Sequence, residues 1–511
     1  MKKRILAGIL SAVLVVATAL SLAACADNKK PGETNKTENN NNPETPGTSA
    51  NGAPAKPNLP TIGTEDEHVV INFAVSEADN DGFHKRSIGD EDYDTENDVD
   101  AAVHTRNQRI AEELYVDIVI AEYNNNGIRG TDIAKALIGQ DETYDVVCGV
   151  QWTDCQLVLD QVLADLTMLE DDDGNPINYI NFNAKYWSSY YIDAMKCGEA
   201  IFWLTGDLCL RYTGGFYCFI ANTQLYEETL KETYGALYDV VKSGKWTYDT
   251  LLEMSKKAFR DLDGDESKIT RDDQQGVAIP QWDNINGLSV AAGVEYCVRG
   301  DDGSITNTFT STNTTLITFM SKLRDIFVSK TAYATYGGDY YGALQDLMSG
   351  NAVFASARLN QVELYLSDME DYMIVPCPKL TEAQSYRSSV HDAVQLYGIN
   401  AASEKIPAAA ATLELMAYYS YTEVRPVYYE SALKLRYTTD DSSAEMIDLI
   451  SNSVYSDFVY IWQFCSTFNG MGDLLRNQTR NKNFSSTIKK REESYNTALE
   501  TIMDDLKALD Y

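Results

Sequence analysis

An alternation of apolar, β-branched runs with helical patterns at residues 68–150 constrains the fold of this chain most strongly. The runs predict strands at 68–75, 117–123 and 145–150, with helices at 98–116 and 131–138 between them. Strand, helix, strand, helix, strand is the pattern of a parallel sheet with crossover helices. Further on, the pattern predicts strands at 215–221, 276–279, 352–356, 372–376 and 393–399 and long helices near 406–420 and 485–509. With 511 residues, the chain is long enough for two lobes. We therefore predict an α/β protein of two lobes, with a parallel sheet flanked by helices at residues 68–150.

The first 25 residues have the pattern of an export signal. Basic residues at 2–4 precede an uncharged stretch at 5–24, which ends in Leu-Ala-Ala-Cys at 22–25. This tetrapeptide resembles the lipobox of bacterial lipoproteins, so we expect a signal peptide at 1–24, a lipid on Cys25, and an extracytoplasmic protein anchored to the cell membrane. An uncleaved transmembrane anchor remains an alternative, because 20 uncharged residues can cross a bilayer.

Residues 25–65 are expected to be a disordered tether that follows the lipidated cysteine. Six of the chain's 12 prolines lie at 26–64, where Leu59 and Ile62 are the large aliphatic residues. Such a composition cannot form a core. The predicted folded body therefore begins near residue 66.

The charge of the chain limits its partners. Residues 1–64 carry 7 basic and 4 acidic side chains of the chain's 42 and 76, which leaves 35 basic and 72 acidic side chains, a charge of −37, on the body. This excess of negative charge opposes binding to nucleic acid or to an anionic membrane surface. We expect a neutral or cationic small partner, and contact with the membrane through the lipid only.

The sequence lacks the common motifs of catalytic and nucleotide-binding sites. The chain has 4 histidines and contains no HExxH, GxSxG, GxxxxGK[ST] or GxGxxG run. The eight cysteines after Cys25 have no zinc-site spacing, and most lie in apolar runs, where a buried thiol is the expected state. Disulfides between Cys148 and Cys155 or between Cys209 and Cys218 remain alternatives. The commonest motif-borne chemistries are therefore excluded, which makes an enzyme less expected.

Over about residues 66–500, the order of several short segments resembles the family 1 extracellular solute-binding lipoproteins of bacterial ABC importers, a mostly sugar-binding group with the type II periplasmic-binding fold. The segments are RNQRIAEEL (106–114), GEAIFWLTGD (198–207), GKWTYDTL (244–251), DLDGD (261–265), MSGNAVF (348–354), YMIVPCP (372–378) and GINAAS (398–403). The resemblance implies a monomer without enzymatic activity or a catalytic cofactor, built of two lobes that are each a mainly parallel sheet flanked by helices. It would capture a small solute, a sugar or oligosaccharide, by hinge closure and deliver it to permease subunits.

The same resemblance implies the boundaries of the lobes. The N-terminal lobe would comprise 66–210 plus 356–398, and the C-terminal lobe 215–352 plus 402–511. Strands crossing between the lobes would lie near 205–215, 352–360 and 395–403.

Candidate ligand residues follow from the rule that ligands bind beyond the carboxyl ends of parallel strands. A sugar requires aromatic faces for its C–H surfaces and polar side chains for its hydroxyls. Trp152 and Trp282 each follow a predicted strand and can face a cleft, whereas Trp203 and Trp246 fit structural positions. The polar candidates lie at strand ends, near suspected crossings, or at His391-Asp392 before a returning strand; they are Glu77, Gln151, Asp207, Arg358 and Asp392.

An acidic loop at 261–272 has the oxygen spacing of an EF-hand. Its candidate ligands are Asp261, Asp263, Asp265, Ser267 and Asp272. Position 6 is Glu266 in place of the usual glycine, and position 12 is an aspartate in place of glutamate, which weakens the match. We expect a structural Ca²⁺ here, with a solvated acidic loop as the alternative.

Two other functions are compatible with the sequence. Paired carboxylates could indicate a secreted lipoprotein glycosidase, whose chemistry needs two carboxyl groups at a suitable separation. A surface protein that binds polysaccharide without an importer is the other alternative.

Overall fold

The computed structural model describes most of the chain from residue 54 onward. The described residues are 54–76, 82–89, 94, 96–123, 131–139, 143–171, 173–265, 269–335, 341–366, 369, 371–432, 441–463, 468 and 470–509. Residues 48–511 form one compact unit by themselves. Cys25 and the predicted signal peptide lie outside the described residues. Among the described helices, none has the length and hydropathy needed to cross a membrane.

The first sheet has four strands in the order β11-β3-β1-β2. Strand β1 (Val69–Ser76) is parallel to β2 (Val116–Tyr123) and β3 (Val146–Val150), and β11 (Gln395–Ile399) is antiparallel to β3. All five residues of β3 and all five of β11 are buried, which explains their continuous apolar sequence. The predicted parallel sheet at 68–150 is confirmed.

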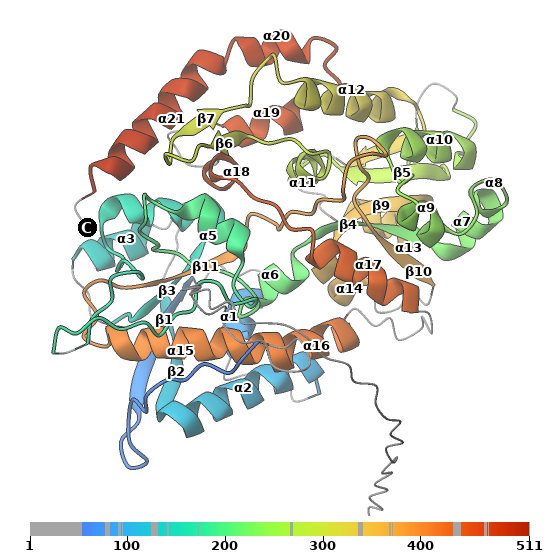
Figure 1. The fold of residues 1–511 in the computed structure, drawn as a ribbon. Coiled ribbons are helices and arrows are strands. Elements are labelled where there is room, and N and C mark those ends of the chain that lie inside the picture. The colour runs from blue at the N-terminus through green and yellow to red at the C-terminus, as the bar shows by residue number, and fades with distance from the viewer. Residues whose placement is uncertain are drawn as a thin grey trace, which may run out of the picture. The chain divides into compact units, whose positions relative to one another are not determined.

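The second sheet has five strands in the order β10-β4-β9-β5-β8. Parallel pairs join β5 (Gln275–Pro280) to β8 (Ala332–Thr335) and to β9 (Ala352–Arg358). Antiparallel pairs join β4 (Tyr217–Asn222) to β9 and to β10 (Tyr372–Pro376). A separate hairpin pairs β6 (Cys297–Arg299) with β7 (Ile305–Asn307). Figure 1 shows the strands of the two larger sheets as two separate groups.

Helices occupy the connections. In chain order they are α1 (Phe83–Ile88), α2 (Asp98–Leu114), α3 (Thr131–Ile138), α4 (Gln151–Asp154), η1 (Cys155–Asp160), α5 (Ser189–Met195), α6 (Leu210–Gly214), α7 (Thr223–Thr229), α8 (Lys231–Tyr234), α9 (Leu237–Lys242), α10 (Tyr248–Ala258), α11 (Asn284–Ala291), α12 (Thr314–Val328), α13 (Gly342–Met348), α14 (Leu359–Tyr365), α15 (Ile406–Tyr419), η2 (Ser420–Val424), α16 (Arg425–Val427), η3 (Tyr428–Ala432), α17 (Asp441–Ser451), α18 (Phe458–Trp462), α19 (Met471–Asn477), α20 (Phe484–Lys489) and α21 (Glu492–Lys507).

Local sequence explains where several helices begin. The side chain of Asn97 accepts hydrogen bonds from the backbone N–H groups of Val99 and Asp100 and so caps α2. The hydroxyl of Thr247 caps α10 in the same way. Trp246, directly before this cap, is fully buried and donates to the carbonyl of Pro376, as expected for a structural tryptophan.

The structure places the lobe boundaries differently from the sequence expectation. Strand β10 and the end of β9 were expected in the N-terminal lobe, but both strands pair within the second sheet, so strand β9 does not cross between lobes. Helix α15, expected in the C-terminal lobe, packs on α2, β1 and β11 (Figure 1). The reason is local: α15 follows β11 directly, and its almost entirely buried surface covers the sheet that contains β11.

Seven of the eight cysteines after Cys25 lie within the described residues. They are Cys148, Cys155, Cys197, Cys209, Cys218, Cys297 and Cys377; all are buried, and none forms a disulfide. Burial raises the pKa of the Cys148, Cys209 and Cys218 thiols, which keeps them protonated. The prediction of buried thiols is confirmed for these seven.

Candidate functional site

The strand ends of both sheets meet along one connecting segment, residues 388–394. The N–H of Trp152, just after β3, donates to the carbonyl of Asp392 at 3.2 Å. The N–H of Tyr217, the first residue of β4, donates to the carbonyl of Ser389 at 3.1 Å. The segment is therefore bonded to the first sheet at one end and to the second sheet at the other. We call the polar cluster around it the junction.

Asp283 is the central carboxylate of the junction. One of its oxygens, Oδ2, lies 2.6 Å from Nε2 of His391 and 3.2 Å from Nη1 of Arg358, and it accepts a hydrogen bond from the Tyr217 hydroxyl at 3.3 Å. The other, Oδ1, accepts from the N–H of Asn284 and caps α11. Burial alone would raise the pKa of Asp283, but Arg358 and His391 outweigh it and hold that pKa well below its usual range.

Asp392 and Arg476 form the second ion pair of the junction, with Nη2 of Arg476 at 3.3 Å from Oδ2 of Asp392. Arg476 belongs to α19, and its guanidinium lies over the ring of Trp282, 5.2 Å from the ring centroid. Asp392 also lies 3.5 Å from His391. Burial and the nearby Arg358 lower the pKa of His391. The two ion pairs are thus linked through His391.

Three buried tyrosines and one amide complete the polar lining. The hydroxyl of Tyr191, on α5, donates to Oε1 of Gln151 at 2.9 Å. Burial raises the pKa of Tyr191, Tyr217 and Tyr460, and the nearby charge of Asp392 adds to the rise in each case. All three hydroxyls therefore remain protonated and can both donate and accept hydrogen bonds.

Trp152 and Trp282 flank the junction and differ from the chain's four other tryptophans. Their exposed fractions are 36% and 39%, whereas the others are at most 4% exposed: Trp187, Trp203, Trp246 and Trp462. This exposure agrees with the strand-end positions inferred from the sequence. Contact of either ring with a ligand stays a prediction.

The structure brings some sequence candidates together and separates others. Gln151, Trp152, Trp282, Arg358 and Asp392 all belong to the junction. Asp207 does not: its carboxylate is paired at 3.4 Å with Arg425 of α16, and burial raises its pKa to about 6. Glu77 lies outside the described residues.

Sequence reasoning missed several junction residues. Asp283 directly follows Trp282, so the strand-end rule could have found it. Arg476 and Tyr460 lie on short helices far along the chain, and no local pattern marks them.

The acidic loop gathers a set of carboxylates that differs from the expected one. Carboxylate oxygens of Asp261, Asp263 and Asp273 lie within 4.8 Å of one another. Asp273 is buried, and it accepts from the N–H groups of Leu262 and Thr270 at 3.1 and 2.8 Å. It replaces the expected Asp272, which is exposed.

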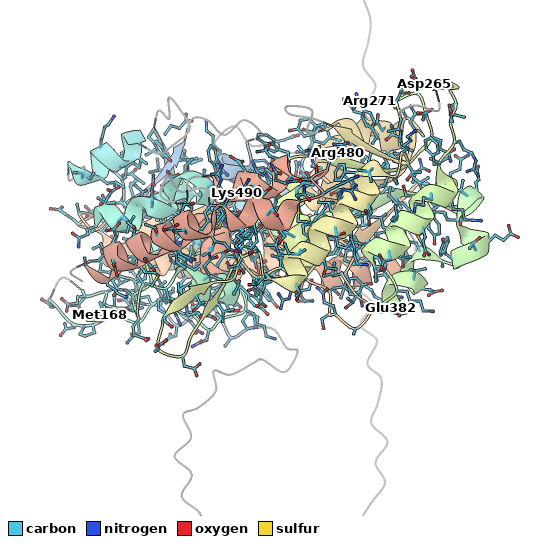
Figure 2. All side chains as sticks on the ribbon, turned by 90° about the horizontal axis from the view of Figure 1, so that it is seen from above. Met168, Asp265, Arg271, Glu382, Arg480 and Lys490 are labelled. Atoms are coloured by element: carbon cyan, nitrogen blue, oxygen red, sulfur yellow. The ribbon has the colours of Figure 1, made fainter. Side chains whose placement is uncertain are left out.

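The remaining expected ligands of the loop do not complete a calcium site. Ser267 lies outside the described residues. Figure 2 shows Asp265 at the outer edge of the molecule in that view. The three gathered carboxylates suit a hard cation such as Ca²⁺ but are fewer than the 6–8 oxygens that it takes. Calcium binding stays a prediction.

A pocket at the opposite edge of the first sheet has a volume of about 370 Å³. It forms where Lys56 and Leu59 lie against Glu113 and Leu114, just before β2 begins, and against Leu415 of α15. The ion pair between Lys56 and Glu113 spans 2.7 Å. The pocket lies at the amino end of the parallel strands, away from the junction.

Comparison with known proteins gives structural matches alone. No family model matches the sequence, and no curated protein matches it. A cyclo/maltodextrin-binding protein complexed with maltotetraose matches with a TM-score of 0.52 and 12% identity, over 88% of this chain and 100% of that one. An ABC substrate-binding protein of Listeria monocytogenes in complex with cycloalternan matches with a TM-score of 0.51 and 13% identity, over 85% and 99%.

A third match is the ABC transporter associated binding protein of B. animalis subsp. lactis in complex with β-1,6-galactobiose, with a TM-score of 0.51 and 12% identity over 86% and 98% of the two chains. At these identities the matches establish the fold. The chain has the two-lobed α/β fold of the sugar-binding proteins of ABC transporters.

Proposed function

We propose that this protein is the extracytoplasmic carbohydrate-binding component of an ABC importer and that the junction binds the sugar. The observation that carries the proposal is the pairing of two exposed tryptophans with buried carboxylates, arginines and tyrosine hydroxyls at the strand ends of both sheets. Aromatic faces suit the C–H surfaces of a sugar, and charged side chains make strong hydrogen bonds to its hydroxyls.

Asp392 connects the two lobes, so a ligand bound at the junction can promote their closure. Its backbone is bonded to Trp152 on the first lobe, and its carboxylate is paired with Arg476 on the second. A ligand that contacts both lobes shifts the population toward the closed form by its differential affinity. A transport protein must also release its ligand, so we expect a Kd near the micromolar range, about −8 kcal/mol.

The central carboxylate does not suit the general-acid role of a glycosidase. A glycosidase needs one carboxylic acid that donates a proton to the leaving group. Asp283 is instead held ionised by Arg358 and His391. Hydrolysis of a glycoside by the purified protein would favour the glycosidase alternative. Binding of polysaccharide without uptake would favour the surface-adhesion alternative.

Membrane anchoring through Cys25 and delivery to permease subunits belong to the same proposal. The Leu-Ala-Ala-Cys tetrapeptide supports the lipid anchor. Replacing Cys25 with Ser should release the protein from the membrane fraction or leave its precursor uncleaved. Wild-type protein found wholly in the medium would contradict the anchor.

A thermal-shift screen tests the proposed binding directly. Residues 48–511, which form one compact unit, would be melted with maltotetraose, cycloalternan and β-1,6-galactobiose. A sugar that binds only the folded state at 100 times its Kd adds about 2.7 kcal/mol of stability. The Trp282→Ala variant serves as the control, because its melting temperature should respond less to the same sugar. No shift with any mono- or oligosaccharide would contradict the proposal.

A further inference from the structure

Helix α18 belongs to the second lobe through its first turn. The Asp457 carboxylate caps the helix by accepting from the N–H of Tyr460 at 2.8 Å, and it also accepts from the N–H of Tyr296 at 2.8 Å. The Tyr296 hydroxyl is bonded to Ser289 of α11 at 2.9 Å, and α11 contacts β4 and β5. These contacts connect α18 to the second sheet.

The same helix packs against the first lobe. It contacts α4, which directly follows β3, and also α5 and η1. All five of its residues, Phe458–Trp462, are buried. In Figure 1, α18 lies between β6 and α5. The α4–α18 contact is therefore a seam between the two lobes.

Each helix of this seam carries a buried hydrogen-bond donor without an acceptor among the described residues. On α4 the donor is Nε2 of Gln151, whose Oε1 already accepts from Tyr191. On α18 it is Nε1 of Trp462. The other buried indoles are paired, with Trp187 donating to Glu414, Trp203 to the carbonyl of Cys155 and Trp246 to that of Pro376, at 3.0, 3.3 and 2.7 Å.

An unpaired buried donor is costly and needs an explanation. Both donor atoms are closed off from solvent, so an acceptor can reach them only when the seam opens. Opening hydrates both donors, and closing without a ligand leaves both unpaired. Closure of the two lobes is therefore more favourable when a ligand that carries a hydrogen-bond acceptor is enclosed between α4 and α18.

We infer that Gln151 and Trp462 are ligand-binding residues that donate hydrogen bonds from opposite lobes to oxygen atoms of the bound saccharide. This inference rests on the proposed function and specifies it further. The ligand must present hydroxyl, ring or glycosidic oxygens at the seam, in addition to the surfaces that meet Trp152 and Trp282. Because the donors come from both lobes, they make closure depend on a saccharide oxygen.

The Trp462→Phe variant tests the inference, because it removes the N–H and keeps an aromatic ring. Its matched control is Trp246→Phe, which removes an indole N–H that is paired. Without ligand, both variants lose the packing of the larger indole ring, but only Trp246→Phe also loses a hydrogen bond, so Trp462→Phe should melt about 1–4 °C higher than Trp246→Phe. With the saccharide that stabilises the wild type, Trp462→Phe should bind about tenfold more weakly, and Trp246→Phe should bind as the wild type does.

Gln151→Glu provides a second test that keeps the acceptor for Tyr191 and removes the amide donor. It should also weaken saccharide binding by about tenfold or more.

Unchanged affinity in Trp462→Phe and Gln151→Glu, together with weaker binding in Trp282→Ala, would overturn the inference and leave the proposed function standing. A ligand-free melting loss in Trp462→Phe equal to that in Trp246→Phe would show that the indole is already paired, for example with a buried water, and would also overturn it. A wild type that binds no saccharide would instead overturn the proposed function.

Discussion

The junction and the acidic loop both concentrate aspartates, but they hold them in different ways. In the junction, Asp283 is buried and paired with Arg358 and His391. In the loop, Asp263 is exposed, and its oxygens accept from Thr270 and from the N–H of Asp265. Solvent screens the exposed carboxylate of the loop more strongly than the buried carboxylate of the junction. A carboxylate therefore influences folding and binding here according to its burial and its partners, not according to how many acids lie near it.

Removing the negative charge of Asp283 should have the largest effect on the free energy of unfolding. Asp283→Asn keeps a cap for α11 but leaves the buried guanidinium of Arg358 without its partner. Breaking a buried ion pair costs about 3–5 kcal/mol, measurable by denaturant unfolding. The matched change in the loop, Asp263→Asn, should cost less than about 0.5 kcal/mol in calcium-free buffer. Equal losses in the two variants would remove the distinction between the regions.

Truncating Trp282 should change affinity more than stability. The ring is partly exposed, so Trp282→Ala should weaken saccharide binding about tenfold to a hundredfold, the equivalent of roughly 1–3 kcal/mol, with a small change in ligand-free melting. Truncating the fully buried Trp246 should instead cost about 3–5 kcal/mol of stability. Calorimetric titration and melting of the same two variants distinguish these outcomes. A strongly destabilised Trp282→Ala with unchanged affinity would exclude Trp282 from the site.

Asp154 extends the comparison to a buried carboxylate that pairs with no cation among the described residues. It lies on α4, its Oδ2 accepts from the N–H of Val150, and burial raises its pKa to about 6. Its pKa in the unfolded chain is about 3.9, so the folded chain binds more protons between about pH 4 and pH 6, and stability falls as pH rises through that window. Asp154→Asn should gain about 2–3 kcal/mol at pH 7.5 and almost nothing at pH 4. Equal gains at both pH values would contradict the assignment to this carboxylate.

The smallest effect is expected in the loop. If Asp261, Asp263 and Asp273 hold Ca²⁺, a chelator should lower the melting temperature of the wild type by a few degrees, and Asp263→Ala should melt equally with and without added calcium. The Asp283→Asn variant is the control, because it should keep the calcium response. Identical wild-type melting in calcium and in chelator would favour a solvated loop.

Sequence reasoning predicted the strands and named several residues that the structure brings to the junction, because both depend on local pattern. The apolar runs that form β1, β3 and β5 can be recognised in the sequence. Gln151 and Trp282 were chosen as candidates because they follow the ends of β3 and β5. Arg476 and Tyr460 could not be found in this way. They reach the junction through α19 and α18, whose positions depend on packing against distant elements.

The lobe boundaries could not be derived from local pattern for a related reason. Strand β10 is a short apolar run that could add to either sheet, and only its pairing with β4 decides. The loop shows the same limit on a smaller scale. Spacing alone favoured Asp272, while the backbone turned Asp273 inward to accept from Leu262 and Thr270.

The buried thiols can report how often the structure around each of them opens. Cys148 lies in the first sheet and Cys218 in the second, both fully enclosed. An alkylating reagent reaches such a sulfur only during a transient opening of the surrounding structure. The modification rate of each thiol, read by mass spectrometry, therefore reports how often its own sheet opens. Comparing the two rates with and without a sugar would show whether ligand protects both sheets equally or one of them first.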